Sequence, residues 1–320
     1  MNAPALSVVL VTDKFETIRG VLKALEQQTA RDSLEVVVVM PADERSNIDE
    51  SIVGQFGAFR VVPVNSIMPM PPARAAGVRA TTAPVIFIGE THSYPHPDFA
   101  AELIAAHEGP WDIVVPGLDN ANPSGPRSWS SFLLDYGYWL SGLPASEVPS
   151  GPTWNASYKR HVLMELDGKL DGALSSGDEL PMELKARNRK FYFAPGAKLS
   201  HVNLETRGWV DERFLSGLVV GANRAKRWSP VRRAAYFFAS PLIPFVLIYR
   251  NMQSLKSLYG RSKLPPGSAA AMIAGSVVRS AGEAVGYLRG IGREQEARME
   301  EYELNKVSYV ERVADWNELA

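Results

Sequence analysis

The feature that most constrains the fold of this chain is the regular alternation of strand-like and helix-like segments in its first 118 residues. Five short runs rich in Val, Ile and Phe have the length of buried strands: residues 7–12, 34–40, 59–64, 85–89 and 111–118. Segments of helical length separate several of them: residues 16–28, 71–83 and 96–109. Continuous apolar strands joined by helical crossovers predict an α/β fold with a parallel sheet covered on both faces, and this half is expected to bind a nucleotide.

Composition excludes several classes of partner and site. The 320 residues are 46% hydrophobic and carry a formal net charge of −1, which predicts a globular chain and argues against a protein that coats nucleic acid. The sequence has no cysteine, which excludes disulfides, thiolate metal sites, iron–sulfur clusters and cysteine nucleophiles and fits a reducing cytoplasm. The opening MNAPALSVVLVT has no charged n-region and no small-residue cleavage site, so no secretory signal is expected.

A polar cluster follows the apolar run 85–88. Glu90, His92 and His96 lie just beyond this strand, and in open parallel sheets ligands bind outside the carboxyl ends of the strands. The cluster is therefore expected where chemistry takes place. Two interpretations stay open for Glu90 and His92: a ligand-binding group, or a solvated turn in which His92 bonds a backbone carbonyl. His96 and His107 are expected to have structural or surface roles.

Residues 119–155 form a predicted long connection in which Pro, Gly and Ser alternate with aromatic residues. The aromatic residues include Trp129, Tyr136, Tyr138, Trp139 and Trp154. Long connections often form binding surfaces, so these side chains are expected either to stack on a sugar or acyl chain or to cover the sheet. Farther on, residues 159–166 and 178–188 predict helices. Residues 190–195 predict a strand that continues into a loop around His201.

The composition changes again after Trp228. Residues 234–249 hold no charge, but this run of 16 residues contains two prolines, whereas a spanning helix needs about 20 apolar residues. Four basic residues precede the run: Lys226, Arg227, Arg232 and Arg233. Two interpretations remain, a helix that completes the core or a monotopic anchor in the headgroup region of a bilayer. We favour the anchor, because basic residues attract anionic lipid and aromatic residues suit the interface.

Several motifs, taken in order, resemble one known enzyme family. They are Thr12 followed by ETIRGVLKALEQQT, EVVVV at 35–39, ARAAG at 73–77, FIGETHSYPHPDF at 87–99, NASYKR at 155–160 and GDELPMELKARNRKFYFAPGAKLSH at 177–201. This set is similar to the inverting glycosyltransferases of family two. The resemblance implies the GT-A fold, a Rossmann-like mixed sheet, in residues 1–228, followed by a helical, membrane-associating region in residues 229–320.

The resemblance also implies a reaction and the residues that perform it. The donor would be a nucleotide-diphosphate sugar, and the sugar would pass to the acceptor in one displacement with inversion. The residues expected to bind the donor are Thr12, Asp13, Glu16, Arg74 and Glu90. Such a transfer needs a carboxylate to take the acceptor's proton, and the family's base matches Asp178, with Glu179 as the second candidate. Alternatively, these two carboxylates only cap the start of a helix.

The chain departs from the family's pattern at positions that usually bind the donor. Met40 and Pro41 stand where an acidic residue usually reads the uracil base, and Ala75 replaces the usual Asn of the third motif. Arg74 is kept. Its guanidinium group is expected either to pair with the diphosphate or to be an ordinary surface arginine.

The family's metal-binding Asp-x-Asp is replaced here by Glu90, Thr91 and His92. In strand-like geometry Glu90 and His92, two residues apart, point to the same side. A carboxylate with an imidazole suits Mn²⁺ or another transition metal better than Mg²⁺, which prefers oxygen ligands. The resemblance adds His201 as a further ligand.

Together these patterns predict an inverting glycosyltransferase that uses Mn²⁺ or Mg²⁺ and acts on a lipid-linked or glycan acceptor of the cell envelope. It would be cytoplasmic, peripheral or monotopic at the inner face of the cell membrane, with the membrane surface as a partner and no nucleic acid. Two alternatives belong to other classes. One is a protein of the same fold that binds a nucleotide sugar or lipid without turnover, and the other is a membrane-peripheral interaction protein.

Overall fold

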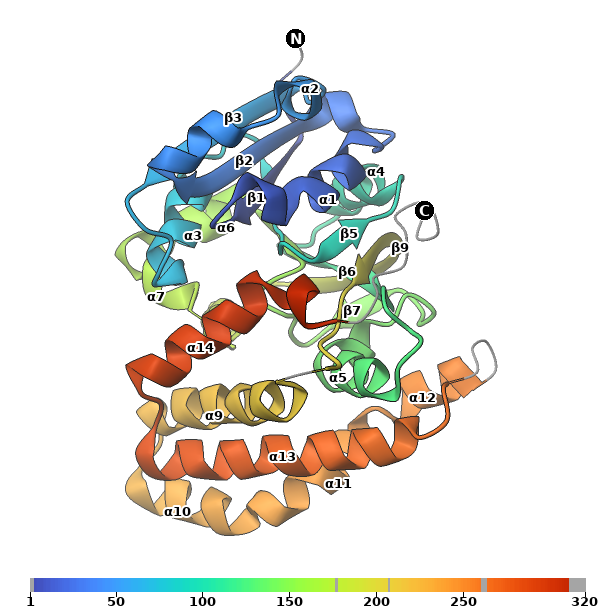
Figure 1. The fold of residues 1–320 in the computed structure, drawn as a ribbon, viewed down its shortest axis with the longest axis vertical. Helices are drawn as coiled ribbons and strands as arrows, with labels where there is room; N and C mark the ends of the chain where they lie inside the picture. The colour runs from blue at the N-terminus through green and yellow to red at the C-terminus, as the bar shows by residue number, and fades with distance from the viewer. Residues whose placement is uncertain (1–2, 176–177, 207, 260–263, 311–320) are drawn as a thin grey trace. The chain divides into compact units, whose positions relative to one another are not determined.

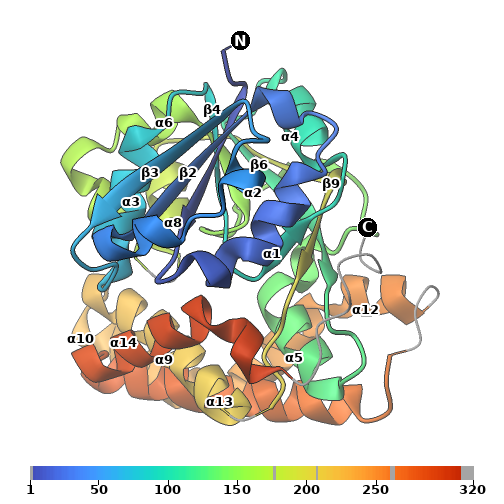
Figure 2. The same cartoon turned by 45° about the horizontal axis from the view of Figure 1, so that its top comes forward.

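The structure is a computed structural model that describes residues 3–175, 178–206, 208–259 and 264–310. Its strands are β1 Leu6–Val11, β2 Leu34–Pro41, β3 Ala58–Val64, β4 Val85–Ile88, β5 Ser93–Pro95, β6 Ile113–Asn120, β7 Ser146–Val148, β8 Ala156–Lys159 and β9 Phe191–His201. In the described residues these nine strands form one sheet in the order β3-β2-β1-β4-β8-β6-β9-β5, with β7 paired to β9. Figures 1 and 2 show β2 and β3 side by side.

The first four strands form the parallel part of the sheet. Val9 of β1 pairs with Val37 of β2 on one side and with Ile88 of β4 on the other, and β3 lies parallel to β2. All five strands predicted from the apolar runs are confirmed, with ends that differ by at most two residues. Because the four strands are parallel, the residues that follow them leave the sheet at the same edge.

The rest of the sheet is antiparallel where its pairing is resolved. β8 pairs antiparallel with both β4 and β6, and β7 pairs antiparallel with β9. The all-parallel sheet predicted from the alternating pattern is therefore wrong beyond β4, whereas the mixed sheet implied by the resemblance is observed. The strands that the pattern missed are β5, β7 and β8, which have only three or four residues and so are too short for a periodic signal.

Fourteen α-helices accompany the strands in the described part of the chain. They are α1 Phe15–Glu26, α2 Glu50–Val53, α3 Met70–Ala80, α4 Phe99–His107, α5 Pro126–Tyr136, α6 Arg160–Met164, α7 Leu170–Ala173, α8 Glu179–Ala186, α9 Trp209–Arg227, α10 Pro230–Ala239, α11 Ile243–Arg250, α12 Met252–Tyr259, α13 Ser268–Arg289 and α14 Arg293–Leu304. The predicted helices are confirmed as α1, α3, α4, α6 and α8. The predicted loose connection is wrong at α5, which buries Trp129 and Tyr136.

Helix α1 follows the predicted periodicity but not the predicted start. Ile18, Leu22 and Leu25 are buried on one face of the helix, as expected from their spacing. In the sequence, Asp13 and Glu16 have the spacing of a capping box, which would make Asp13 the N-cap. Instead Lys14 is the N-cap, and the described structure shows no side-chain capping bond there. Asp13 accepts a hydrogen bond from the Thr17 hydroxyl at 2.8 Å.

By the contacts between its residues the chain divides into two compact units. The first comprises residues 3–119 and 144–200, and the second comprises residues 120–143 and 201–310. The last residue of β6 and the last residue of β9 belong to the second unit by this division, although both strands are continuous. The domain boundary predicted after residue 228 falls inside the second unit.

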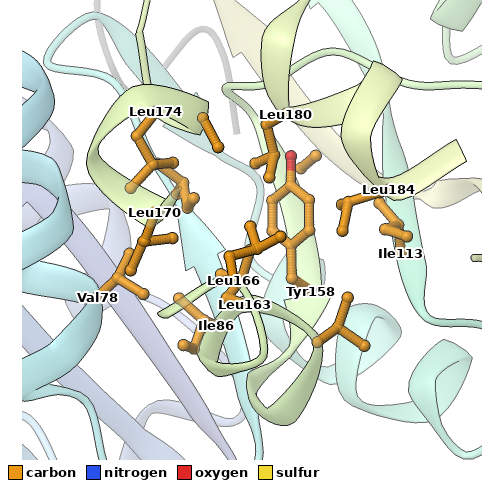
Figure 3. Close-up of a cluster of buried hydrophobic side chains, with 14 of the residues drawn as sticks. Val78, Ile86, Ile113, Tyr158, Leu163, Leu166, Leu170, Leu174, Leu180 and Leu184 are labelled. Carbon is orange, nitrogen blue, oxygen red and sulfur yellow. The ribbon is translucent and has the colours of Figure 1, made fainter. Parts of the chain in front are cut away.

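A hydrophobic core of the first unit surrounds Tyr158 of β8. Figure 3 shows this ring among leucine side chains, with Leu180 and Leu184 of α8 close to it. The Tyr158 hydroxyl donates to the carbonyl of Thr153 at 2.8 Å, so its polar end is satisfied although the residue is fully buried. Burial of Leu180 and Leu184 anchors α8 and thereby fixes the position of its first turn.

The second unit is built on very close packing of α9 against α13. Gly217 and Gly221 on α9 meet Gly282 and Gly286 on α13, and a Cβ atom at any of these four positions would collide with backbone atoms of the opposite helix. Glycines four residues apart lie on one helix face, so these two pairs let the backbones touch. Figure 1 shows α13 with α9 on one side and α10 and α11 on the other.

Candidate metal and donor site

The carboxyl ends of β1 and β4 bring the predicted donor-binding segments to one edge of the sheet. The Gly89 amide donates to the Val9 carbonyl at 3.0 Å, and the Thr12 amide donates to the Val39 carbonyl at 3.0 Å. These bonds continue the ladder just past the ends of the strands. Thr12 and Glu90 therefore follow neighbouring strands at the same edge, where open α/β sheets bind their ligands.

Glu90 and His92 come together with His201, the last residue of β9. β9 lies next to β5 in the sheet, and the His96 amide donates to the Lys198 carbonyl at 3.0 Å. In the described residues one ligand atom each from Glu90, His92 and His201 lie within 4.8 Å of one another. Glu90 Oε2 and His92 Nε2 are 3.5 Å apart. We call these three residues the triad.

The triad is nearly buried, which excludes the solvated turn as an interpretation of His92. The side chains of His92 and Glu90 are 1% and 9% exposed, and His201 is also buried. A solvated turn is therefore wrong for this segment. Two imidazoles and a carboxylate are a donor set for a first-row transition metal, whereas Mg²⁺ prefers oxygen ligands. The residues thus fit a divalent transition metal, as the sequence predicted.

Asn155 holds Glu90 in place, and sequence analysis did not identify it as a site residue. Its side-chain amide donates to Glu90 Oε2 at 2.5 Å, and the Ser93 hydroxyl donates to the same oxygen at 3.3 Å. Asn155 has a φ of 55°, a left-handed conformation that Asn tolerates better than most residues. Its own amide donates to the Ile88 carbonyl at 2.8 Å, which fixes it beside the end of β4.

Asn203 orients His201 and determines which ring nitrogen carries the proton. The Asn203 side-chain nitrogen donates to the His201 carbonyl at 2.8 Å and to Asn120 Oδ1 at 2.9 Å, and a backbone carbonyl can only accept. Asn203 Oδ1 therefore faces His201 Nδ1, 2.9 Å away, and must accept its proton. Nε2 then carries the lone pair that a metal ligand needs.

Asn203 is itself fixed by a buried asparagine network. The Asn203 amide donates to Asn122 Oδ1 at 2.8 Å, and Asn122 returns a bond from its side chain to the Asn203 carbonyl at 2.8 Å. Asn120 Oδ1 accepts from the Asn122 amide at 3.1 Å and from the Ser128 hydroxyl at 3.0 Å, in addition to Asn203. The ring of Tyr136 packs against His201 with centroids 4.6 Å apart.

Arg74 is buried against Trp154 rather than lying on the surface. Its guanidinium carbon lies 3.8 Å from the Trp154 ring centroid, and the residue is only 7% exposed. The surface-arginine alternative is therefore wrong. Trp154 directly precedes Asn155, so this stack links α3 to the segment that holds Glu90.

The remaining predicted donor residues lie in different environments. Thr12 is buried at the end of β1, and Asp13 follows it. Glu16 points away from this group on the face of α1, where its side chain is 74% exposed and pairs with Arg19 at 2.6 Å. Met40, which stands at the position of the base-reading acid, is fully buried in β2.

Asp178 and Glu179 lie at the start of α8. Asp178 occupies the N-cap position, but in the described structure its side chain makes no capping hydrogen bond, and Glu179 begins the first turn. A side-chain capping bond therefore does not account for Asp178, although its charge lies at the end of the helix where the dipole favours an anion. Gly177, the first residue of the corresponding sequence motif, lies outside the described residues. The assignment of the catalytic base to Asp178 or Glu179 stays a prediction.

The other two histidines of this unit that we singled out have structural partners, as expected. His96 Nε2 lies 2.9 Å from the Ser200 hydroxyl, and burial lowers the pKa of His96. His107 Nε2 lies 2.8 Å from the Ser157 hydroxyl. Burial, followed by the nearby Lys159 cation, lowers the pKa of His107 to about 4, so its ring is neutral in the folded protein at pH 7.

No known protein family matches the sequence, and no curated protein is similar to it in sequence. Solved structures are similar in fold. The mannosyltransferase PcManGT from Pyrobaculum calidifontis, solved with GDP-Man and Mn²⁺, matches 91% of this chain and 89% of its own length, with a TM-score of 0.55 and 16% identity.

Two further solved structures are less similar. GalNAc-T7, solved with UDP, GalNAc and Mn²⁺, matches 63% of this chain with a TM-score of 0.49 and 18% identity, and this chain spans 44% of its length. The 1–349 fragment of S. aureus TarS, solved with UDP, matches 90% of this chain and 93% of its own, with a TM-score of 0.47 and 15% identity. The match to the mannosyltransferase over nearly its whole length, with the mixed sheet and the additional carboxyl-terminal helices, confirms the predicted GT-A fold.

Proposed function

We propose that this chain is a metal-dependent inverting glycosyltransferase that uses a nucleotide-sugar donor and diverges from family two. The observation that carries the proposal is the position of the triad at the carboxyl edge of a GT-A sheet. The mannosyltransferase with the same fold was solved with a nucleotide sugar and Mn²⁺, which supports this class of donor.

Each residue of the site has a separate task in the proposed reaction. Glu90, His92 and His201 would hold the divalent cation, and such a cation offsets the negative charge that develops on a leaving diphosphate. Arg74 would add a fixed guanidinium charge for the same phosphates. In the transfer, the oxygen of the acceptor hydroxyl would form a bond to the anomeric carbon of the sugar while the bond from that carbon to the diphosphate breaks. Asp178, or Glu179 in its place, would accept the proton that this hydroxyl loses.

We also propose that the acceptor is a lipid-linked sugar or a cell-envelope glycan at the inner face of the cell membrane. The support comes from the second unit, whose helices α10 and α11 expose large apolar side chains such as Phe238 and Phe245. An enzyme attached to the bilayer would meet an acceptor whose reactive hydroxyl stays near the headgroups.

Two specific observations favour other functions. The buried Met40 and the Ala75 of the third motif depart from donor-binding positions, which favours a protein that binds a nucleotide sugar without turnover. Two histidines and one carboxylate are also the donor set of non-haem Fe(II) oxygenases. The fold favours the transferase over the oxygenase, because the structural relatives are glycosyltransferases.

The test is release of nucleoside diphosphate by the purified full chain from UDP- and GDP-hexoses, with Mn²⁺, Mg²⁺ or Fe²⁺ added singly. We expect release with Mn²⁺ from one of these donors, loss of release in His92→Ala and its retention in His96→Gln, whose imidazole lies outside the triad. Saturable donor binding without release would favour the non-catalytic alternative. No binding of any donor would end the proposal, and proton NMR of the product anomer would decide between inversion and retention.

A further inference from the structure

Helices α10 and α11 present apolar side chains to solvent where a water-facing helix usually presents polar ones. They are joined by a short 3₁₀ helix, η5 Ser240–Leu242. Phe238 is 78% exposed, Phe245 71% and Tyr249 79%, and Val231 and Leu242 are also exposed. Soluble monomers rarely leave an apolar patch of this kind uncovered, so it marks an interaction surface. Together α10, η5 and α11 form one bent helical stretch along α13, which we call the apolar hairpin.

The opposite face of the apolar hairpin is fixed to α13. Arg233 donates from Nε to the Tyr287 carbonyl at 2.7 Å, and Ser280 of α13 donates to the Ser240 carbonyl at 2.5 Å. The covered residues recur at helical spacing: residues 240 and 251 are buried, and 233, 237, 244 and 247 are partly buried. A surface helix of a soluble protein usually packs its apolar side on the protein and turns its polar side to water. The hairpin has the opposite arrangement, because its protein-facing side carries hydrogen bonds and its outer side is apolar.

This segment lies along α13 rather than standing alone as a spanning helix. Among the described residues, Pro230–Leu258 is the one helical stretch that is long and apolar enough to cross a membrane, and only 6% of its most apolar window is buried. A core helix of a soluble protein would be mostly buried. The hairpin is interrupted by η5 at Pro241, and both α10 and α11 contact α13 along their length. This geometry suits insertion to headgroup depth.

The charge around the apolar hairpin fits an anionic partner. Residues 213–282 contain eleven Lys or Arg residues and no Asp or Glu. Several of these cations pair inside the protein, but five that flank or edge the hairpin are exposed: Lys226, Arg227, Arg232, Arg250 and Lys256. Near a bilayer that contains anionic lipid, each exposed basic residue strengthens binding about fivefold.

Aromatic rings occupy the boundary between the basic and apolar residues. Trp228 packs on Tyr236 with ring centroids 4.4 Å apart, and the Arg232 guanidinium lies 4.4 Å from the Trp228 ring centroid. Tyr249 lies at the other end of the hairpin next to Arg250. Trp and Tyr beside Arg are typical of the membrane–water interface, where one end of the ring is apolar and the other is wet.

We propose that the apolar hairpin is a monotopic docking surface for an anionic lipid bilayer, with Phe238 and Phe245 inserted at the boundary between headgroups and acyl chains and Tyr249 among the headgroups. Docking of this kind would bring the enzyme to the membrane-proximal acceptor of the proposed function. It rests on that function only for the identity of the acceptor. Binding to vesicles needs no turnover, so docking and transferase activity fail independently.

The first test is flotation of the full chain with phosphatidylcholine vesicles that contain or lack 30 mol% phosphatidylglycerol. We expect binding to the anionic vesicles, weakened at least tenfold by raising NaCl from about 0.05 to 0.5 M and by Phe238→Gln with Phe245→Gln. The matched control is Val210→Gln with Val307→Gln, two exposed apolar residues outside the hairpin, which should bind like the wild type. Equal binding of both double variants, or no binding by the wild type, would overturn the proposal.

The second test measures depth and separates the other occupants of this surface. The chain has no cysteine, so Phe245→Cys or the control Val210→Cys can be labelled with a polarity-sensitive fluorophore at one position. We expect a blue shift on anionic vesicles only at position 245, quenched more strongly by spin labels near the headgroup than by labels near the bilayer centre. Strongest quenching at the centre would indicate a spanning helix. A blue shift that depends on protein concentration without vesicles would indicate a second copy of the chain, and either result would refute monotopic docking.

Discussion

Replacing Asn203 should weaken metal binding although Asn203 does not belong to the triad. The variant Asn203→Leu keeps the approximate shape of the side chain but removes the acceptor for His201 Nδ1 and the donor to Asn120 Oδ1 and to the His201 carbonyl. His201 then loses the partner that keeps the proton on Nδ1. We expect the affinity for Mn²⁺ to fall by about 10- to 100-fold, as when the outer partner of a ligating histidine is removed.

The expected effect can be measured as a loss of ligand-induced stability. At a Mn²⁺ concentration of 100 times the wild-type dissociation constant, one site stabilises the folded chain by about 2.7 kcal/mol. If the dissociation constant of the variant is 10- to 100-fold larger, the same Mn²⁺ concentration stabilises it by only about 1.4 to 0.4 kcal/mol. The variant also loses up to three hydrogen bonds, so its metal-free free energy of unfolding should fall by about 2 to 3 kcal/mol.

The assay is urea unfolding of both proteins with and without Mn²⁺, together with isothermal titration of the ion. The control is Ser200→Ala, in the same strand as His201. This variant removes the 2.9 Å hydrogen bond between Ser200 and His96 and leaves the three residues of the triad unchanged. It should lower stability by about 1 kcal/mol and leave the Mn²⁺ dissociation constant within about twofold. If Asn203→Leu is folded and binds Mn²⁺ as tightly as the wild type, Asn203 does not position His201.

Further predictions concern the base, the donor stack and the response to acid. Asp178→Asn should lower kcat by about 10²- to 10⁴-fold and Glu179→Gln by less than tenfold, measured as initial rates of diphosphate release, and the reverse order would assign the base to Glu179. Arg74→Lys should lower the free energy of unfolding by about 1 to 2 kcal/mol in urea titrations, because the planar cation over Trp154 is lost, and an unchanged value would deny the stack a stabilising role. Since the pKa of His107 is lowered to about 4, the unfolded chain takes up the proton first as pH falls. The contribution of His107 to stability is therefore complete above about pH 6.5 and is lost toward pH 4. Between pH 7.5 and 4.5 the wild type should lose about 2 to 3 kcal/mol more than His107→Gln, and equal losses in urea titrations at the two pH values would contradict the shift.

The parallel half of the fold could be predicted because its signals are local. The strand runs and the buried stripe of α1, with Ile18, Leu22 and Leu25, are periodic patterns within single segments. β8 was missed because its four residues give no period, and its place between β4 and β6 is fixed by long-range pairing that no local pattern contains. Helix α5 was missed because Pro, Gly and Ser around it predicted a loop, whereas the proline occupies the first turn of the helix.

The metal-ligating residues of the site could be predicted from the sequence, but the residues that orient them could not. Glu90 and His92 stand out because they are polar residues two apart after an apolar strand, and the resemblance added His201. Asn155 and Asn203 carry no such signal, since an asparagine in a loop is usually a turn residue. Their importance follows from buried hydrogen bonds between segments that are far apart in the sequence.

The order of α10, α11 and α13 along the chain has a consequence for synthesis. The hairpin leaves the ribosome before α13, the helix that receives its hydrogen-bonded face, and about 39 residues separate the end of α11 from the end of α13. At translation rates of about 5 to 20 residues per second, the nascent hairpin waits roughly 2 to 8 seconds without that support. During this interval both of its faces are open to chaperones, to targeting factors or to a nearby bilayer. Whichever of them engages it first would act on an incomplete second unit, before the glycine contact between α9 and α13 can close.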